Sequence, residues 1–288
     1  MSTDFLASMA HSSHARVERA SAEMSAAALR AQALQSPRPP ALRLSSAGFD
    51  LIAEVKLRSP AAGRLGGQAE DIGARVAAYA AAGAAAISVI TEPSRFEGEL
   101  SHLAQAAQLA TGVPVMRKDF LVDPYQVYEA RLHGAAGVLV ILRMLEESMQ
   151  ERMLAACEES GLFALLECFD EADLARAQLL VRRHASRGML LVGINCRDLV
   201  SLQVVPGRLD ALAALLPEGA ARVAESGVET PADAERLARA GYGVALVGSA
   251  LMRANDPAAL ARDLLAQGRA ARADTSPLRG ALPREMQR

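Results

Sequence analysis

Aromatic residues and cysteines are scarce in this chain, and each shortage excludes a class of function. Phe, Tyr and Trp make up 3% of the 288 residues and Trp is absent, which leaves little for the stacking platforms that bind single-stranded nucleic acid. The three cysteines (Cys157, Cys168 and Cys196) are odd in number and show no CxxC spacing. We therefore expect no metal site, and a reducing cytoplasm as the compartment.

Long apolar runs and blocks of like charge are also missing. No stretch approaches the roughly 18 consecutive apolar residues of a transmembrane helix, and the N-terminus has no signal-peptide core. Lys and Arg number 31 against 33 Asp and Glu, which gives a formal net charge of -2 without a basic arm. Neither nucleic acid nor a membrane is therefore an expected partner, and a soluble protein of enzyme size remains.

What the chain does have is a regular alternation of apolar segments and Ala-rich helical patterns after residue 50. Strands are expected at 51–56, 85–90, 114–118, 136–141, 163–167, 190–195, 221–225 and 244–248. Helical patterns follow them at 71–82, 100–110, 124–133, 146–160, 170–183, 208–216, 231–240 and 256–266. Two helices are expected to begin at Asp123-Pro124 and Thr230-Pro231, where a capping side chain precedes a proline suited to the first turn.

Eight strands that alternate with eight helices predict parallel pairing, because parallel strands need a crossover between them. The strand ends Lys56 and Gly248 are 192 residues apart (248 minus 56) over seven repeats, or about 27 residues per unit. This places the chain in the α/β class, and the repeat is typical of a (β/α)8 TIM barrel. A doubly wound open sheet is the alternative, but the chain has neither GxGxxG nor a GxxxxGK phosphate loop.

The two ends of the chain do not fit the repeat. Residues 1–50 predict one or two amphipathic helices and a Pro-rich connector, an N-terminal helical extension that either covers one end of the barrel or lies free in solvent. Residues 51–268 are the expected catalytic barrel. Residues 269–288 predict a disordered tail, because they are charged and lack long apolar runs.

Charged and polar residues stand at the ends of five expected strands. Active sites of such barrels lie at the carboxyl ends of the strands, where side chains from several strands converge. Because side chains alternate along a strand, Glu54 shares a face with Lys56. If these faces point inward, the barrel mouth holds a mutually neutralising cluster: Glu54, Lys56, Lys118, Glu167, Asn195, Arg197 and Glu225. Any one of these residues alone could equally be a solvated residue at the rim or part of a structural ion pair. Such residues at the ends of five strands together are not explained in this way.

Small residues follow the last two strands. Ser226 and Gly227 come after the seventh strand, and Gly248 and Ser249 come at the end of the eighth. Their backbone N–H groups and hydroxyls suit a phosphate, and barrels commonly bind phosphate after these two strands. Two ordinary Gly-containing turns are the structural alternative.

Histidine and cysteine offer no comparable pattern. No imidazole base or zinc site is indicated, because no strand end carries any of the five histidines: His11, His14, His102, His133 and His184. Cys168 and Cys196 directly follow candidate residues, so we expect them to point away from the site as apolar packing residues.

Several motifs resemble the indole-3-glycerol-phosphate synthases of tryptophan biosynthesis. They are AEVKLRSP (53–60), PVMRKDFLVDPYQVYEARLHGA (114–135), GINCRDL (193–199), VAESGVETPADAERLARAG (223–241) and LVGSALMRANDP (246–257). The similarity runs in register from about residue 50 to 266, and the region before it resembles the extra helical segment of the family.

The resemblance implies a reaction. The family converts 1-(2-carboxyphenylamino)-1-deoxy-D-ribulose 5-phosphate into indole-3-glycerol phosphate, carbon dioxide and water, as a carboxy-lyase without a metal or an organic cofactor. Ring closure needs an acid that polarises the sugar carbonyl, and the final dehydration needs both an acid and a base. The implied partner is therefore a small sugar phosphate that carries an anthranilate group. A monomer or a weak homodimer is the expected assembly.

The resemblance also implies a role for each candidate by its position. Lys118 would be the acid of ring closure, while Glu167 and Lys56 would serve the later proton transfers in an order that stays open. Glu54 would hold the lysines, and the polar middle of the substrate would be lined by Glu225 and Asn195. The anthranilate carboxylate would be bound by Lys56 and Arg197, with Ser59 as a further site position. The phosphate would be held by Ser226, Gly227, Gly248 and Ser249.

The sequence leaves other functions open. Another phosphate-binding barrel enzyme, such as a sugar-phosphate isomerase or a Schiff-base aldolase, would also place charges at strand ends. A non-catalytic relative could keep the phosphate site alone, and the same reaction could serve a specialised indole pathway.

The sequence also departs from the pattern of the family at four places. They are Leu57, Ala61-Ala62, Cys168-Phe169 and Val205-Pro206, and they concern loop detail rather than the reaction.

Overall fold

Eight parallel strands close into a barrel in the computed structural model, which describes residues 5–65, 71–199 and 201–275. Around the ring they are β1 (Asp50–Val55), β10 (Val244–Val247), β9 (Ala221–Glu225), β8 (Leu190–Asn195), β7 (Phe163–Cys168), β6 (Gly137–Ile141), β5 (Val115–Lys118) and β4 (Ala86–Ile90). The ring closes where β4 pairs with β1. Every predicted strand is present within one residue of its expected bounds, so the predicted (β/α)8 barrel is confirmed.

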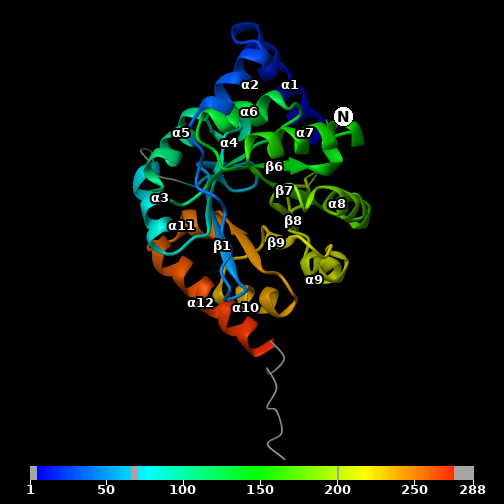
Figure 1. The fold of residues 1–288 in the computed structure, drawn as a ribbon. Helices are drawn as coiled ribbons and strands as arrows, with labels where there is room; N and C mark the ends of the chain where they lie inside the picture. The colour runs from blue at the N-terminus through cyan, green and yellow to red at the C-terminus, as the bar shows by residue number, and fades with distance from the viewer. Residues whose placement is uncertain (1–4, 66–70, 200, 276–288) are drawn as a thin grey trace, which may run out of the picture.

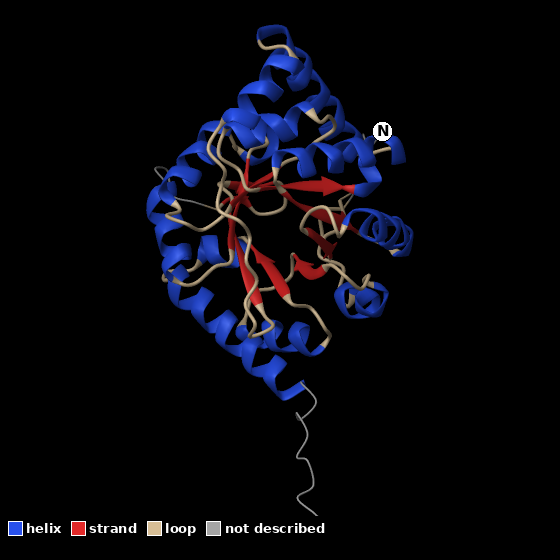
Figure 2. Ribbon diagram, viewed as in Figure 1, coloured by secondary structure: helices blue, strands red, loops and turns tan. Residues whose placement is uncertain are grey.

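Helices surround the ring of strands in the predicted order (Figures 1 and 2). They are α3 (Ile72–Ala81), α5 (Leu100–Leu109), α6 (Tyr125–Leu132), α7 (Glu147–Ser160), α8 (Glu171–His184), α9 (Arg208–Leu212), α10 (Pro231–Arg239) and α12 (Pro257–Thr275). Thr230 forms a capping box with Asp233 at the start of α10, and Asp123 accepts a hydrogen bond from the backbone N–H of Tyr125 at the start of α6. The predicted start at Thr230-Pro231 is therefore confirmed, whereas α6 begins one residue later than predicted, with Pro124 as its N-cap residue. None of the helices in the described part of the chain is long and apolar enough to cross a membrane.

Short elements that the hydrophobic pattern did not predict shape the mouth of the barrel. After β1, β2 (Arg58–Ser59) pairs antiparallel with β3 (Gly63–Arg64), and α4 (Pro93–Phe96) follows β4. The short 3-10 turn η1 (Leu142–Met144) follows β6, and α11 (Ser249–Arg253) follows β10. A second 3-10 turn, η2 (Ala213–Leu215), lies between α9 and β9 at the opposite end of the barrel, within the predicted helix 208–216. Elements of two to five residues are too short to show a readable hydrophobic period, which is why most of them could not be predicted from the hydrophobic pattern.

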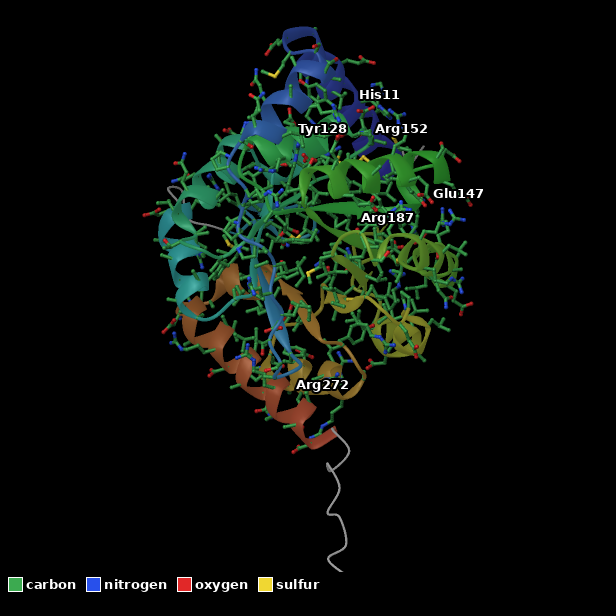
Figure 3. All side chains as sticks on the ribbon, viewed as in Figure 1. His11, Tyr128, Glu147, Arg152, Arg187 and Arg272 are labelled. Carbon is green, nitrogen blue, oxygen red and sulfur yellow. The ribbon has the colours of Figure 1, made fainter. Side chains whose placement is uncertain are left out.

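Alternating side chains build two separate apolar layers. One layer lies between the strands and the surrounding helices, and the other lies inside the ring and includes Ile52 and Leu165. Because the side-chain period of a strand is two, Glu54 and Glu167 face inward as well, each two residues farther along its strand. The barrel interior is therefore a packed apolar core, with the buried side chains of Glu54 and Glu167 above it. Figure 3 draws the side chains on the ribbon.

The N-terminal helices α1 (Phe5–Glu23) and α2 (Ala26–Gln35) pack on the barrel (Figure 1). Met9 of α1 is buried in the same cluster as the barrel interior. Gln126 of α6 donates a hydrogen bond to Ser13 Oγ (2.8 Å), and both side chains are buried. Arg16 of α1 reaches Asp119, just beyond the carboxyl end of β5. Of the two alternatives for this extension, covering one end of the barrel is therefore the correct one.

The C-terminal helix is longer than predicted. α12 continues to Thr275, so the prediction of a disordered tail is wrong for residues 269–275, and the remainder of that tail (276–288) lies outside the described residues. Arg269 donates a hydrogen bond to Phe49 O (3.0 Å) and forms an ion pair with Asp50 (3.1 Å), and Ala271 is buried. These contacts with the start of β1 stabilise a helix end whose local composition favours disorder.

Candidate active site

One cavity at the carboxyl-terminal end of the barrel brings together all twelve predicted site residues. Its space, open solvent at the mouth included, is about 1000 Å³. The twelve come from six strands and the loops that follow them: Glu54, Lys56, Ser59, Lys118, Glu167, Asn195, Arg197, Glu225, Ser226, Gly227, Gly248 and Ser249. Residues that are far apart in the sequence meet here because all the strands point the same way.

Glu54 lies at the centre of the charged cluster, with 2% of its surface exposed. Its Oε1 is 2.9 Å from Lys56 Nζ, and its Oε2 is 3.7 Å from Lys118 Nζ. Burial alone would raise the pKa of Glu54, but the two ammonium groups hold that pKa below its ordinary value. The apolar first strand therefore carries a carboxylate because two lysines need a common counter-ion.

Lys118 connects β5 to a second carboxylate. Its Nζ lies 3.9 Å from Glu167 Oε2. Burial lowers the pKa of Lys118, but the charges of Glu54, Glu167 and Glu225 outweigh burial, so the pKa lies above its ordinary value. Lys118 is therefore protonated at neutral pH, which is the form that a general acid requires.

Glu225 is a carboxyl group with 1% of its surface exposed. Within the described residues neither of its oxygens accepts a hydrogen bond. Burial and the neighbouring charge of Glu167 raise the pKa of Glu225 well above its ordinary value, and the opposing effect of Lys118 is smaller. The raised pKa favours the neutral form of Glu225, next to the two lysines and the carboxyl groups of Glu54 and Glu167.

Asn195 and Arg197 extend the polar cluster along β8. Asn195 Nδ2 donates a hydrogen bond to Glu167 Oε2 (3.1 Å), and Asn195 Oδ1 accepts one from the backbone N–H of Arg197 (2.9 Å). One N–H of the Arg197 guanidinium donates to Leu202 O (2.7 Å). A guanidinium has five N–H donors in a planar fork, so Arg197 is suited to bind a carboxylate that enters the cavity.

The turns after β9 and β10 line the cavity with small residues. Ser226 and Gly227 both have left-handed backbone conformations, with φ angles of 66° and 68°. A serine rarely adopts this conformation, and such strain is concentrated at functional sites. Gly248 precedes α11, the short extra helix typical of phosphate-binding barrels, and Ser249 is the first residue of that helix.

Part of the cavity wall is apolar, and the sequence did not predict it. Phe5 of α1 meets Phe120 edge to face with ring centroids 5.8 Å apart, and Phe96 of α4 lies 6.0 Å from the same ring. Leu139 and Ile141 of β6 continue this surface. Phe120 belongs to the RKDF motif and could have been read from it. Phe5 and Phe96 lie in no recognised motif, so no local signal marks them.

Asp119, which directly follows Lys118, connects the N-terminal extension to β5. Its carboxylate accepts two hydrogen bonds from Arg16 (2.7 and 2.8 Å), one from Thr91 (2.8 Å) and one from Arg117 (3.1 Å). Burial alone would raise the pKa of Asp119, but Arg16 and Arg117 hold that pKa well below its ordinary value. The backbone next to Lys118 is therefore held by charge-assisted hydrogen bonds, whose only sequence sign was the Asp of RKDF.

Histidine and cysteine are absent from the described lining of the cavity. The cysteines are buried free thiols in the apolar layer outside the ring, as predicted for Cys168 and Cys196. His11 lies on α1, outside the ring of strands (Figure 3). Across residues 5–65, 71–199 and 201–275, no three His, Cys, Asp or Glu side chains group in a way that could hold a metal ion.

Sequence comparisons show which protein family this chain belongs to. The family model described as "Indole-3-glycerol phosphate synthase" matches residues 6–264. The indole-3-glycerol phosphate synthase of Parafrankia sp. (strain EAN1pec) is 41% identical over 248 residues, which cover 85% of this chain and 89% of that protein. The protein of the same name from Mycobacterium tuberculosis (strain CDC 1551 / Oshkosh) is 39% identical over 258 residues, with coverages of 88% and 91%.

Solved structures with this architecture share much less sequence. The 3-hexulose-6-phosphate synthase of Salmonella typhimurium has a TM-score of 0.60 at 17% identity and covers 76% of this chain and 98% of its own. The thiamine phosphate pyrophosphorylase of Pyrococcus furiosus has a TM-score of 0.55 at 15% identity, with coverages of 78% and 97%. At these identities the likeness concerns the fold alone.

Proposed function

Because this chain belongs to the indole-3-glycerol phosphate synthase family, we propose that its cavity carries out the ring closure, decarboxylation and dehydration of that reaction. The substrate is 1-(2-carboxyphenylamino)-1-deoxy-D-ribulose 5-phosphate, and the product enters tryptophan biosynthesis. One observation carries the assignment of the site: a protonated lysine, Lys118, lies between the buried carboxylates of Glu54 and Glu167. The same cavity has an apolar wall and small-residue turns.

The three chemical parts of the substrate fit three parts of the cavity. The phosphate is assigned to the turns after β9 and β10, whose small residues leave backbone N–H groups accessible. The aromatic ring is assigned to the wall of Phe96 and Phe120, since aromatic rings pack favourably edge to face or offset. The carboxylate is assigned to Arg197 and Lys56, the cations nearest the polar end of β8 and β1.

Ring closure requires a proton at the sugar carbonyl oxygen. As the aromatic carbon that bears the carboxylate attacks the carbonyl carbon, Lys118 donates its proton to the carbonyl oxygen and a hydroxyl forms. The carbon–carbon bond to the carboxylate then breaks, carbon dioxide leaves, and the bonding electrons restore the aromatic ring. Arg197 stabilises the carboxylate only until it leaves, so this contact does not hold the product.

Dehydration needs an acid for the leaving hydroxyl and a base for the proton on the adjacent carbon. Lys56 forms an ion pair with Glu54, which suits the acid. Glu167 accepts a hydrogen bond from Asn195, which orients its carboxyl group for the role of the base. We assign the two roles in this order, which the sequence had left open.

Turnover of the purified protein tests the function. We expect steady formation of indole-3-glycerol phosphate, followed by indole fluorescence, with one carbon dioxide released per product. Borohydride should trap no substrate on Lys118 or Lys56, since a covalent adduct is the mark of a Schiff-base aldolase. A folded protein that binds the substrate without turnover would instead be a non-catalytic relative.

Inorganic phosphate should inhibit competitively, because the turns bind the dianion without contacting the rest of the substrate. Gly227→Ala should weaken both phosphate and substrate by about tenfold, since a left-handed conformation costs a non-glycine residue about 1–2 kcal/mol. A Cβ there would also lie 2.8 Å from Cys196 Sγ. Inhibition and Michaelis constants are the measurements. Gly112→Ala is the matched control, with a φ of 85° and nothing within 4 Å of its Cβ, and equal effects of both variants would contradict the phosphate assignment.

Glu54→Gln should displace the pH dependence of turnover. Gln keeps the shape of Glu but removes the negative charge that helps to raise the pKa of Lys118. The acid form of Lys118 is lost as the pH rises through its pKa, so the alkaline limb of the pH–rate profile should move to lower pH. Profiles of kcat for the two proteins are the measurement, and an unchanged limb would make Glu54 a packing residue.

We also propose that the protein works in the reducing cytoplasm. All three cysteines are free thiols and are buried, which suits a reducing compartment. Intact activity after treatment with a mild oxidant that forms disulfides, with three free thiols recovered on denaturation, would agree with this placement.

A further inference from the structure

Inward-facing glycines in the described barrel are covered by side chains of neighbouring strands. At each of them a Cβ atom would overlap the covering side chain. The pairs are Gly137 with Phe163, Gly193 with Glu225, and Gly248 with Glu54. The first pair lies at the beginning of β6, in the apolar floor of the barrel, whereas the other two lie in the charged cluster.

Gly193 occupies a special place among these positions. In the strand register Gly193 is opposite Glu167 of β7, and Asn195, two residues later, is opposite Glu225 of β9. A Cβ at Gly193 would overlap Glu225 Oε1. The Glu225 side chain therefore extends across β8 toward Glu167. It occupies space that the side chain of any other residue at position 193 would fill.

We propose that Gly193 is a positioning residue of the reaction, whose missing side chain lets Glu225 and Glu167 lie together and hold one proton between their two carboxyl groups. The proposal rests on the assignment of both glutamates to the active site. The proton belongs to Glu225, which donates it in a hydrogen bond to the carboxylate of Glu167. This bond fixes the carboxylate that serves as the base of dehydration.

The charges around Glu225 agree with such a pair. The groups that face it are Glu167 of β7, Lys118 of β5 and Glu54 of β1, and both glutamates oppose its ionisation. Two carboxyl groups side by side in a buried site do not both ionise, because like charges repel strongly where water is excluded. Neither Glu225 oxygen has a hydrogen-bond partner among the described residues, so the proton of a neutral Glu225 is not engaged elsewhere and can be donated to the neighbouring carboxylate of Glu167.

Gly193→Ala is the test. The methyl group should push the Glu225 carboxyl away from Glu167 and toward the open cavity, where its pKa falls and it ionises at neutral pH. We expect kcat to fall by about 10–100-fold, as for a catalytic group misplaced by about 1 Å, with a much smaller change in KM. Below the alkaline limb set by Lys118, the step of the kcat profile that reports the neutral form of Glu225 should move to lower pH, because that form is then lost at lower pH.

Gly137→Ala is the matched control. Its methyl group would overlap the Phe163 ring, so it creates a similar steric conflict without touching a carboxyl group. We expect a lower melting temperature and an unchanged pH profile. If Gly193→Ala behaves in the same way, Gly193 serves packing alone and the proposal is wrong.

Glu225→Asp should relieve the steric conflict that Gly193→Ala creates. It removes one methylene from the side chain at position 225 and so makes room for the methyl group that is added at position 193. The double variant Gly193→Ala/Glu225→Asp should be at least as active as Glu225→Asp, so that the two changes are not additive. This comparison also decides the matter if Gly193→Ala alone does not fold. A double variant slower than Glu225→Asp would overturn the proposal.

The proton pair can also be observed without turnover, which separates this proposal from the proposed function. Wild-type protein at neutral pH should show the infrared C=O band of a protonated carboxyl group. Glu225→Gln should remove this band and Gly193→Ala should weaken it. A missing band in active wild-type enzyme contradicts the proton pair, whereas an inactive wild type that shows the band contradicts only the function.

Discussion

Lys118→Met should lower kcat by about 10²–10⁴-fold while the barrel stays folded. Met has a similar length and fills the same space, but it has no proton to donate to the sugar carbonyl. Lys118 is the cation that lies between Glu54 Oε2 (3.7 Å) and Glu167 Oε2 (3.9 Å), so no other described lysine has this position. The single-turnover rate of ring closure is the measurement, with a thermal melt to show that the fold is intact.

Lys118→Arg separates the proton from the charge. Arg keeps a cation near both carboxylates but scarcely gives up its proton, so we expect a folded and slow enzyme here too. A fully active Arg variant would mean that the positive charge is sufficient and that no proton leaves residue 118. Near-normal turnover of the Met variant would move the acid of ring closure to Lys56.

Asp119→Asn should have the largest effect on stability, a loss of about 3–5 kcal/mol in the free energy of unfolding. Asn keeps the shape of Asp but leaves the buried guanidinium of Arg117, which is 1% exposed, without one of its two carboxylates, and removes the counter-ion of Arg16. Denaturant unfolding is the measurement. Equal unfolding free energies for the two proteins would show that hydrogen bonds alone, without the charge, are sufficient at this site.

The same ion pairs make the stability of the fold depend on pH, and the pKa of Asp119 determines the direction of this dependence. The pKa of Asp119 is held below its ordinary value in the folded protein, so its stabilisation is present above that ordinary value, near pH 3.9, and decreases as the pH falls below it. The difference in stability between wild type and Asp119→Asn should therefore shrink on acidification. Arg30→Met is a suitable control, because Arg30 connects α2 to Glu159 in an exposed ion pair that should contribute little.

The polar part of the site could be predicted because it follows local rules. Glu54, Lys118 and Glu167 each stand at the end of an apolar segment, and the parallel barrel brings such ends together. The period of two then sets which of them face inward. Nothing beyond strand position was needed to place these side chains in one cavity, and the resemblance supplied the chemistry.

The remaining features depend on contacts between segments that are far apart in the sequence. Phe5 becomes part of the cavity only because α1 folds over the barrel, and Arg16 is 103 residues from its partner Asp119. The helical end of α12 likewise depends on Arg269 reaching Asp50. Local composition carries no signal of such pairs, so single-sequence patterns missed the apolar wall, the Asp119 network and the true end of the last helix.

Leu57, interpreted from the sequence as a departure from the family, lies next to a charged contact between two loops. Arg58 and Arg64 of the β2–β3 hairpin both approach Glu97, which follows α4, at 3.0 and 3.6 Å. The loop after β1 therefore keeps a charged contact with the loop after β4 although Leu57 itself is apolar. These arginines are half exposed, so the contact guides the position of the loop more than it stabilises the fold.

Closure of the ring also determines when the fold can be completed during synthesis. β1 leaves the ribosome well before its neighbour β10, which begins 194 residues later (244 minus 50). Until then β1 has one unpaired edge, and the most recently added strand of the sheet has another. Unpaired strand edges can pair with strands of other chains. Such a distant pairing also makes folding slow. The nascent protein is therefore exposed to aggregation until β10 has been synthesised, because only then can the ring close.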